Sequence, residues 1–149
     1  MAKCRDVMTK DPASCQPTDS ITKVAGLMKQ EDVGSVPIVD SADSRRLTGI
    51  ITDRDIVVKV IAAGRAADAT TVRDAMTPNP ASCRETDDVE QAVKLMKERQ
   101  VRRMPIVDAE GRLTGIIAQA DVATRVNKDS KTGELVEAIS ESGTSRPRT

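Results

Sequence analysis

The stretch Gly49-Ile50-Ile51-Thr52-Asp53-Arg54-Asp55 joins a short apolar run to a helical pattern that begins at Ile56. The run from Leu47 to Ile51 is typical of a strand, and the charged residues after Thr52 mark its end. Where a strand turns directly into a helix, the first backbone N–H groups of the helix lack partners inside it. Such a helix start favours either a capping side chain or an anionic ligand.

A second copy of this design follows later in the chain, as Gly115-Ile116-Ile117-Ala118-Gln119-Ala120-Asp121. Residues 8–40 align without a gap with residues 76–108, and residues 46–51 align with 112–117. Pieces such as Pro-Ala-Ser-Cys and Pro-Ile-Val-Asp recur in register, which excludes chance similarity. Two copies predict two packed halves rather than a long solenoid.

Each copy predicts the same five elements in the order β-α-β-β-α. The first copy gives an extended piece at 13–15, a helix from Ile21 capped by Asp19 or Ser20, strands at 36–39 and 47–51, and a helix from about Asp53. The second gives an extended piece at 81–83, a helix from Val89 capped by Asp87 or Asp88, two matching strands, and a helix from about Gln119. One such unit has a thin core, so we expect an α+β fold in which the two repeats pack as a pseudo-twofold pair.

We therefore divide the chain into four segments: repeat 1 at 5–64, a linker with a short helix at 65–75, repeat 2 at 76–127, and a polar, partly disordered tail at 128–149. The spacing of Leu135, Val136 and Ile139 in the tail is compatible with one or two turns of helix.

The closing helix of the first copy, residues 56–63, is apolar almost all round, and Gly64 suits its C-terminal cap. A helix that is apolar on all sides must be covered on all sides. We expect a homodimer through these helices, and burial within one chain is the alternative.

Composition narrows the class of function. The formal net charge is zero, and no apolar run approaches the length of about 20 residues that a membrane span needs, so we expect binding neither to nucleic acid nor to a membrane. The N-terminal residues lack the apolar core of a signal peptide, which predicts a cytoplasmic location.

The chain contains no His and no aromatic residue. The commonest general base and metal ligand is thus missing, and we predict neither an enzyme nor a metal site.

Three cysteines, Cys4, Cys15 and Cys83, are widely spaced and include no Cys-x-x-Cys motif. Cys15 and Cys83 occupy equivalent places in the two copies. We interpret the cysteines as small buried hydrophobic residues. A disulfide, a zinc site or a catalytic thiol is the alternative.

Taken together, these motifs resemble the CBS domain family, in the tandem arrangement called a Bateman module. The resemblance rests on an apolar-Pro-apolar-Val-Asp strand and a Gly-Ile-Ile-x-x-x-Asp turn in each copy, and it covers residues 5 to about 126. The form Thr-Asp-Arg-Asp-Ile, followed by Val-Ile-Ala-Ala-Gly, is similar to stand-alone bacterial signalling proteins made only of such a pair. The resemblance implies a regulatory module that senses AMP, ADP, ATP or S-adenosylmethionine in clefts between the repeats. Without an attached output domain, it would signal to a separate effector protein that the sequence does not identify.

Family roles carry over residue by residue. In the family, the aspartate that ends the turn binds both ribose hydroxyls, and a Thr or Ser near its start contacts phosphate. One site would then use Thr52, Arg54 and Asp55, walled by Thr77, Ala81 and Met104, with Arg102 and Arg103 also able to neutralise phosphate. The other site would use Asp121, walled by Thr9, Ala13 and Val36. A carboxylate can accept hydrogen bonds from both hydroxyls of a ribose, which agrees with the role implied for the aspartates.

The two copies also differ at the turn. Ala118 stands where the second turn should have Thr or Ser, and Gly34-Ser35 stands where the second copy has Arg102-Arg103. We therefore predict unequal sites, with the nucleotide at Asp55. Simpler interpretations stay open: a capping box for Thr52 and Asp55, a solvated surface pair for the two arginines, and a core position for Met104. The competing function is a structural or protein-interaction homodimer that binds no ligand.

Overall fold

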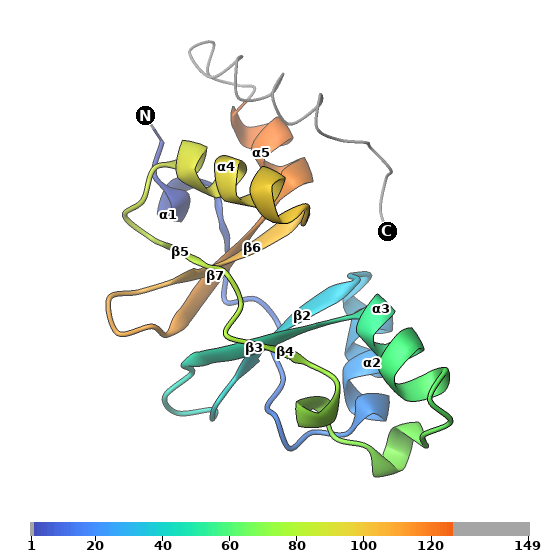
Figure 1. Ribbon diagram of the computed structural model, residues 1–149. Helices are drawn as coiled ribbons and strands as arrows, with labels where there is room; N and C mark the ends of the chain where they lie inside the picture. Colours follow the sequence, from blue (N-terminus) through green and yellow to red (C-terminus); the bar gives the residue numbers. More distant parts are fainter. Residues whose placement is uncertain (1, 127–149) are drawn as a thin grey trace. The chain divides into compact units, whose positions relative to one another are not determined.

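The computed structural model describes residues 2–126, which form two compact units of helices and short strands (Figure 1). The terminal unit contains residues 2–12 and 81–126, and the middle unit contains residues 13–80. The predicted α+β class is confirmed. The predicted tail at 128–149, with its helical turns near Leu135, lies outside the described residues. In the part of the chain that is described, no helix combines the length and apolar character needed to cross a membrane.

The middle unit is built on a three-stranded antiparallel sheet in the order β2 (Ser35–Val39), β3 (Leu47–Thr52) and β4 (Thr77–Pro78). Helix α2 (Ile21–Glu31) begins where predicted, because the Ser20 hydroxyl accepts a hydrogen bond from the backbone N–H of Lys23 at 3.1 Å. Helix α3 (Asp53–Ile56) follows β3 without a loop. The predicted linker forms two short 3₁₀ turns, η2 (Ala67–Ala69) and η3 (Val72–Asp74).

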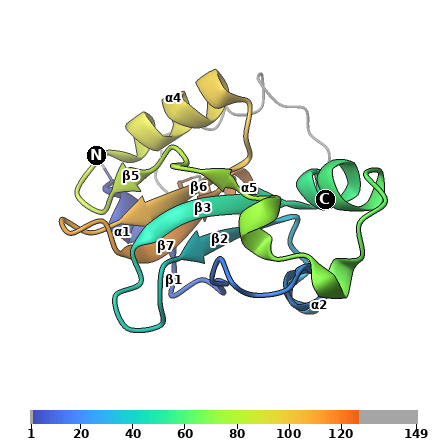
Figure 2. The ribbon, with the colours of Figure 1, turned by 60° about the horizontal axis from the view of Figure 1, so that its bottom comes forward.

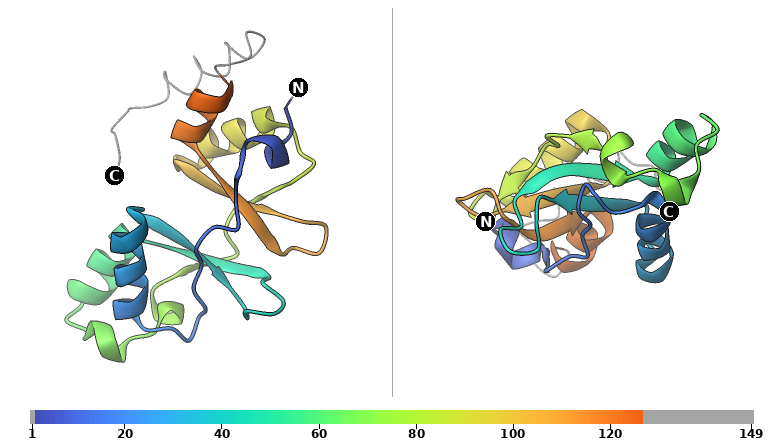
Figure 3. Two further views of the ribbon diagram at one scale, coloured as in Figure 1. Left: turned by 180° about the vertical axis from the view of Figure 1, so that it is seen from behind. Right: turned by 90° about the horizontal axis from the view of Figure 1, so that it is seen from below.

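The terminal unit has a four-stranded sheet in the order β1-β7-β6-β5. Its strands are β1 (Thr9–Lys10), β5 (Cys83–Arg84), β6 (Arg103–Val107) and β7 (Leu113–Ala118), and its helices are α1 (Cys4–Val7), α4 (Val89–Arg99) and α5 (Gln119–Val126). Helices α4 and α5 lie on one side of this sheet when it is seen from the front and from behind (Figures 1 and 3). Asp88 precedes α4 but forms no capping hydrogen bond, since its carboxylate instead lies 2.8 Å from the ammonium of Lys3.

The two compact units do not coincide with the two sequence repeats. The segment before Ala13 belongs to the first copy in sequence, yet β1 pairs with β7 of the second copy, with Thr9 opposite Ile116 (Figure 2). In the same way β4, at the start of the second copy, pairs with β3 of the first, with Thr77 opposite Ile50. Each sheet is therefore completed by a strand that the other copy provides.

Each unit has its own hydrophobic core. Ile38 and Ile51 centre the core of the middle unit, and Ile106 and Ile117 occupy the matching places in the terminal unit, all fully buried. All three cysteines are buried and unpaired, as the sequence interpretation expects.

The closing helix of the first copy differs from the regular helix predicted for it. After the single turn of α3, the backbone widens into a π-helix, η1 (Val57–Ile61), in which the Ala62 N–H donates to the Val57 carbonyl at 2.8 Å. Gly64 then takes φ +75°, which supports its predicted role as a helix terminator. Apolar periodicity indicates a helix here but does not distinguish the α from the π form.

Candidate functional site

The turn from β3 into α3 is closed by its own side chains. The Thr52 hydroxyl accepts a hydrogen bond from the Asp55 N–H at 3.1 Å, and the Asp55 carboxylate accepts one from the Thr52 N–H at 3.0 Å. The capping-box interpretation is therefore confirmed. The Thr52 hydroxyl acts as the acceptor in this pair, so its hydrogen can still be donated to a ligand.

Asp55 has a second partner on the next turn of the helix. Its Oδ1 lies 3.3 Å from the Lys59 ammonium, and the Asp55 side chain retains 16% of its exposure. Lys59 also donates to the Ala75 carbonyl at 3.2 Å. The carboxylate is thus held in place from both sides, and each of its oxygens still has a further lone pair available.

The second turn, from β7 into α5, is built differently. Ala118 is buried at 7% exposure and has no hydroxyl to donate. The Gln119 N–H donates to the Arg102 carbonyl at 2.9 Å, as the Asp53 N–H does to Gly34 in the first copy. Asp121 accepts a hydrogen bond of 3.3 Å from the hydroxyl of Thr9 on β1. The acidic group of this turn therefore contacts the N-terminal strand β1.

The predicted site residues are divided between the units. The middle unit holds Ala13, Val36, Thr52, Arg54, Asp55 and Thr77, and the terminal unit holds Thr9, Ala81, Arg102, Arg103, Met104 and Asp121. Within the units, contacts join Thr52 to Asp55 and Thr9 to Asp121. Each of the two predicted sites takes residues from both units.

Two of the predicted wall residues are core residues in the structure. Val36 and Met104 are each 1% exposed and belong to the cores of their units. Ala81 is half-buried and also packs against the core of the terminal unit. The core interpretation of Met104 is therefore confirmed, and its direct contact with a ligand stays a prediction.

Ser35 is a polar group that the sequence interpretation did not assign to the site. It lies opposite Thr52 in the β2–β3 register. Its hydroxyl oxygen is buried, and among the described residues it has no hydrogen-bond partner. A buried polar atom without a partner costs free energy, so a ligand group that bonded to it would recover that cost. The sequence feature that could have identified Ser35 is its alignment with Arg103, a predicted site residue, at a position where the two copies differ in charge.

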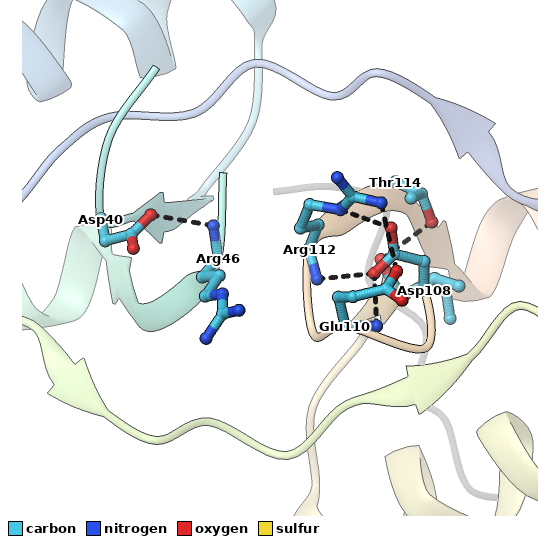
Figure 4. A network of polar contacts seen from close by, with 7 residues as sticks. Asp40, Arg46, Asp108, Glu110, Arg112 and Thr114 are labelled. Atoms are coloured by element: carbon cyan, nitrogen blue, oxygen red, sulfur yellow. Dashed lines mark hydrogen bonds and ion pairs between the residues drawn. The ribbon is translucent and has the colours of Figure 1, made fainter. Parts of the chain in front are cut away.

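The hairpin tips are fixed by an aspartate in each unit (Figure 4). Asp108 accepts from the backbone N–H groups of Glu110 and Arg112, both at 2.9 Å, and from Nε of Arg112 at 2.9 Å. These bonds hold the pKa of Asp108 below its usual range. Asp40 accepts from Ser44 and from the backbone N–H of Arg46 at 2.9 Å, and its pKa is likewise lowered, chiefly by the Ser44 hydroxyl. The shared Val-Asp sequence thus has a structural role in both copies.

A pocket of about 560 Å³ opens beside the second of these hairpins. It is lined by β5 and the residues on either side of it, by the end of β6 and by the β6–β7 loop: Ser82, Cys83, Arg84, Asp87, Val107, Asp108, Ala109, Glu110 and Gly111. None of the residues predicted for ligand binding lines it. Within residues 2–126, no three or more His, Cys, Asp or Glu side chains are grouped so as to hold a metal ion.

These observations define a class of protein: a duplicated α+β domain in which each sheet is completed by a strand from the other copy and each copy ends in a strand-to-helix turn with an aspartate. The chain belongs to the CBS domain family, whose signature matches residues 4–62 and 72–128. The predicted family is therefore confirmed.

Three similar proteins show how this family is used elsewhere. Hypoxic response protein 1 of Mycobacterium tuberculosis is 33% identical over 123 residues, covering 83% of this chain and 84% of that protein. The crystal structure of Hypoxic Response Protein I, with two coordinated zinc ions, superimposes with a TM-score of 0.76 at 31% identity, covering 83% of this chain and 98% of that one.

The other two were crystallised with adenosine-containing ligands. CBSX2, a CBS-pair protein from Arabidopsis thaliana, was solved in complex with AMP, and it has a TM-score of 0.75 at 27% identity, with 87% and 99% of the two chains covered. The CBS domain pair of MJ0100 was solved with 5-methylthioadenosine and S-adenosyl-L-methionine, and it has a TM-score of 0.72 at 25% identity, with 86% and 98% covered.

Proposed function

We propose that this protein is a non-enzymatic regulatory module that binds an adenine nucleotide or S-adenosylmethionine and passes the signal to a separate effector protein in the cytoplasm. The observation that carries the proposal is the turn at Thr52–Asp55, where an available hydroxyl hydrogen and a held carboxylate share one helix start. The AMP complex of CBSX2 and the S-adenosylmethionine complex of MJ0100 support this class of ligand.

At the preferred site, Asp55 accepts hydrogen bonds from the two ribose hydroxyls through the lone pairs that its protein partners leave available. Thr52 donates to a phosphate oxygen, and the exposed guanidinium of Arg54 neutralises the phosphate charge. The unsatisfied hydroxyl of Ser35 gives this site a further donor.

The family resemblance implies the remaining roles at the preferred site. It assigns an apolar wall to Ala81 and Met104, a polar edge to Thr77, and further positive charge to Arg102 and Arg103. For the second site it implies Asp121 with Thr9, Ala13 and Val36. That site is weaker, because Ala118 has no hydroxyl that could donate to phosphate.

Signalling in this proposal proceeds through a homodimer. Val57, Val58 and Ile61 on η1 remain 53%, 49% and 63% exposed, so these side chains of the apolar helix are not covered by residues 2–126. Adjacent exposed side chains of this kind are typical of an interaction surface, and a second copy of the same helix matches it in chemistry.

A homodimer that binds no ligand is the second candidate. The observation in its favour is the capping box, which accounts for Thr52 and Asp55 without a nucleotide. Under this candidate the two residues contribute only to stability.

Thermal unfolding of the full chain with AMP, ADP, ATP and S-adenosylmethionine distinguishes the candidates. A ligand present at a hundred times its Kd stabilises the folded state by about 2.7 kcal/mol and raises the Tm. Asp55→Ala should remove this rise. Asp74→Ala is the matched control, since Asp74 also closes a capping box, with Thr71, but lies outside both predicted sites.

Both substitutions should lower the Tm of the unliganded protein, whereas only Asp55→Ala should abolish the response to ligand. Absence of a response in the wild-type protein, or an equal loss in both variants, would favour the structural dimer.

A further inference from the structure

Cys4 and Cys83 come from distant parts of the sequence and meet in the core of the terminal unit. Cys4 is the first residue of α1 and is 0% exposed, and Cys83 is the first residue of β5 and is 5% exposed. The backbone around them is tied together, because the Cys4 N–H donates to the Asp87 carbonyl at 2.8 Å. Both side chains belong to one hydrophobic cluster, where each thiol is the largest influence on the pKa of the other, and the Cys4 thiol donates to the Asp88 carbonyl at 3.9 Å.

Packing alone does not require two thiols in these places. The position equivalent to Cys4 in the other copy is Val72, and the position equivalent to Cys83 is Cys15. Val72 and Cys15 both lie in the core of the middle unit. The same fold is therefore built with a valine in one unit and with a second thiol in the other.

The two thiols of the pair have different surroundings. Cys83 lines the pocket of about 560 Å³ beside the β6–β7 hairpin, whereas Cys4 lies behind it without exposure. Contact with Cys4 lowers the pKa of the Cys83 thiol, whereas contact with Cys83 together with burial raises the pKa of Cys4. Cys83 is thus the thiol that a small oxidant reaches from the pocket, and Cys4 is the thiol that lies deeper in the same core.

We propose that Cys4 and Cys83 form a reversible disulfide when the protein meets a hydroperoxide. The Cys83 thiolate attacks the terminal oxygen of the peroxide, the O–O bond breaks, and the alkoxide or hydroxide that leaves takes a proton from water. This step oxidises Cys83 to a sulfenic acid. The Cys4 sulfur then attacks the Cys83 sulfur, forms the S–S bond and displaces the hydroxyl group, which leaves as water with the Cys4 proton. In total, two thiols and one hydroperoxide give one disulfide, one alcohol or water molecule, and one further water molecule.

The bond would fasten the N-terminal segment to the second repeat. This segment carries β1, whose Thr9 contacts Asp121, and it is held by the pairing of β1 with β7 and by the contacts of α1. A covalent link between residues so far apart in sequence restricts the unfolded chain, so the oxidised protein should have a higher Tm than the reduced protein.

The test treats the folded, reduced full chain with hydrogen peroxide, followed by thiol titration under denaturing conditions and peptide mapping without reductant. The number of titratable thiols should fall from three to one, with Cys4 and Cys83 recovered in one cross-linked peptide pair, and a dithiol should restore all three. Cys4→Val, which copies the residue found at Val72, should stop the reaction at a Cys83 sulfenic acid that dimedone traps.

Cys15→Ala is the matched control, because Cys15 occupies the place equivalent to Cys83 but has no thiol at the equivalent of Cys4. Burial raises the pKa of Cys15 to about 11, and its loss should leave the cross-link unchanged. A disulfide that involves Cys15, a bond between two chains, or three intact thiols after the peroxide treatment would overturn the proposal. Dimedone labelling in Cys4→Val that equals the labelling of Cys15 would overturn the assignment of Cys83 as the attacking thiol.

Discussion

The hydroxyl of Thr9 donates a 3.3 Å hydrogen bond to the carboxylate of Asp121, joining two residues that are 112 positions apart. It connects β1, from the start of the first copy, to α5, at the end of the second. In the middle unit the equivalent Asp55 has Thr52 and Lys59 as partners instead. The duplicated aspartates thus occupy matching places in the repeat but have different environments.

Thr9→Val should lower the free energy of unfolding by about 0.5–1.5 kcal/mol, because it removes one hydrogen bond while conserving volume. A double-mutant cycle with Asp121→Ala, measured by urea denaturation, should show coupling between the two sites. The matched cycle is Thr77→Val with Asp55→Ala, in which we expect no coupling. Equal coupling in both cycles would contradict the asymmetry.

Thr52→Ala should destabilise the protein by about 1 kcal/mol, since the hydroxyl caps the first turn of α3. Thr52→Ser keeps the oxygen and should retain most of that stability. Urea denaturation of the three proteins without ligand measures the difference. If the alanine and serine variants were equally stable, the capping bond would make no contribution.

Gly115→Ala should cost about 1–3 kcal/mol through overpacking. A Cβ at this position would collide with Sδ of the buried Met8 and would lie 3.0 Å from the Thr9 carbonyl oxygen, so both a side chain and the backbone of β1 would have to move. Thermal and urea unfolding give the size of the effect.

Gly26→Ala provides the opposite control for this substitution. Gly26 is exposed on α2, and a Cβ there would meet no atom within 4 Å. Its replacement should stabilise the protein by about 0.5–1 kcal/mol, because alanine is the better helix former. A stabilising Gly115→Ala would show that β1 does not pack against β7 as described.

Ile61→Glu should convert the proposed homodimer into a monomer, because it places a charge in the middle of the exposed apolar surface of η1. Sedimentation velocity at micromolar concentration measures the change. Val101→Glu is the control, since Val101 is also an exposed apolar residue, at 44%, but lies in the other unit. A wild-type protein that sediments as a monomer would exclude this dimer.

Acid should weaken the hairpin at Asp108. Its pKa is lower in the folded protein than the usual 3.8, so its contribution to stability is fully present above about pH 3.8 and is lost as the pH falls through the folded pKa. Asp108→Asn should therefore be less stable than the wild type at pH 7, and this difference should shrink below pH 3.8. Urea denaturation across pH 2–7 tests the trend, and a constant difference would exclude the carboxylate as its cause.

The sequence was sufficient for the order of elements because the two copies support each other. Apolar runs at 36–39 and 47–51 recur at equivalent places, and the strands predicted there are present. The extended piece predicted at 13–15 is reduced to a single bridge between Cys15 and Ile38. The cap at Ser20 was predictable since it depends on a hydroxyl next to the helix start. The sequence could not show that Asp88 forms no cap on α4, because Lys3, the residue that it pairs with instead, is distant in the sequence.

What the sequence by itself determined is the duplicated fold, the family and the identity of the polar residues at each turn, since these follow from local pattern and repetition. Only the tertiary structure decided that residues before Ala13 complete the unit of the second copy, that Thr9 reaches Asp121, and that Cys4 and Cys83 share one core. The physical reason is that a repeated local pattern predicts which segments form strands and helices. It does not predict which distant strand pairs with the free edge of each sheet.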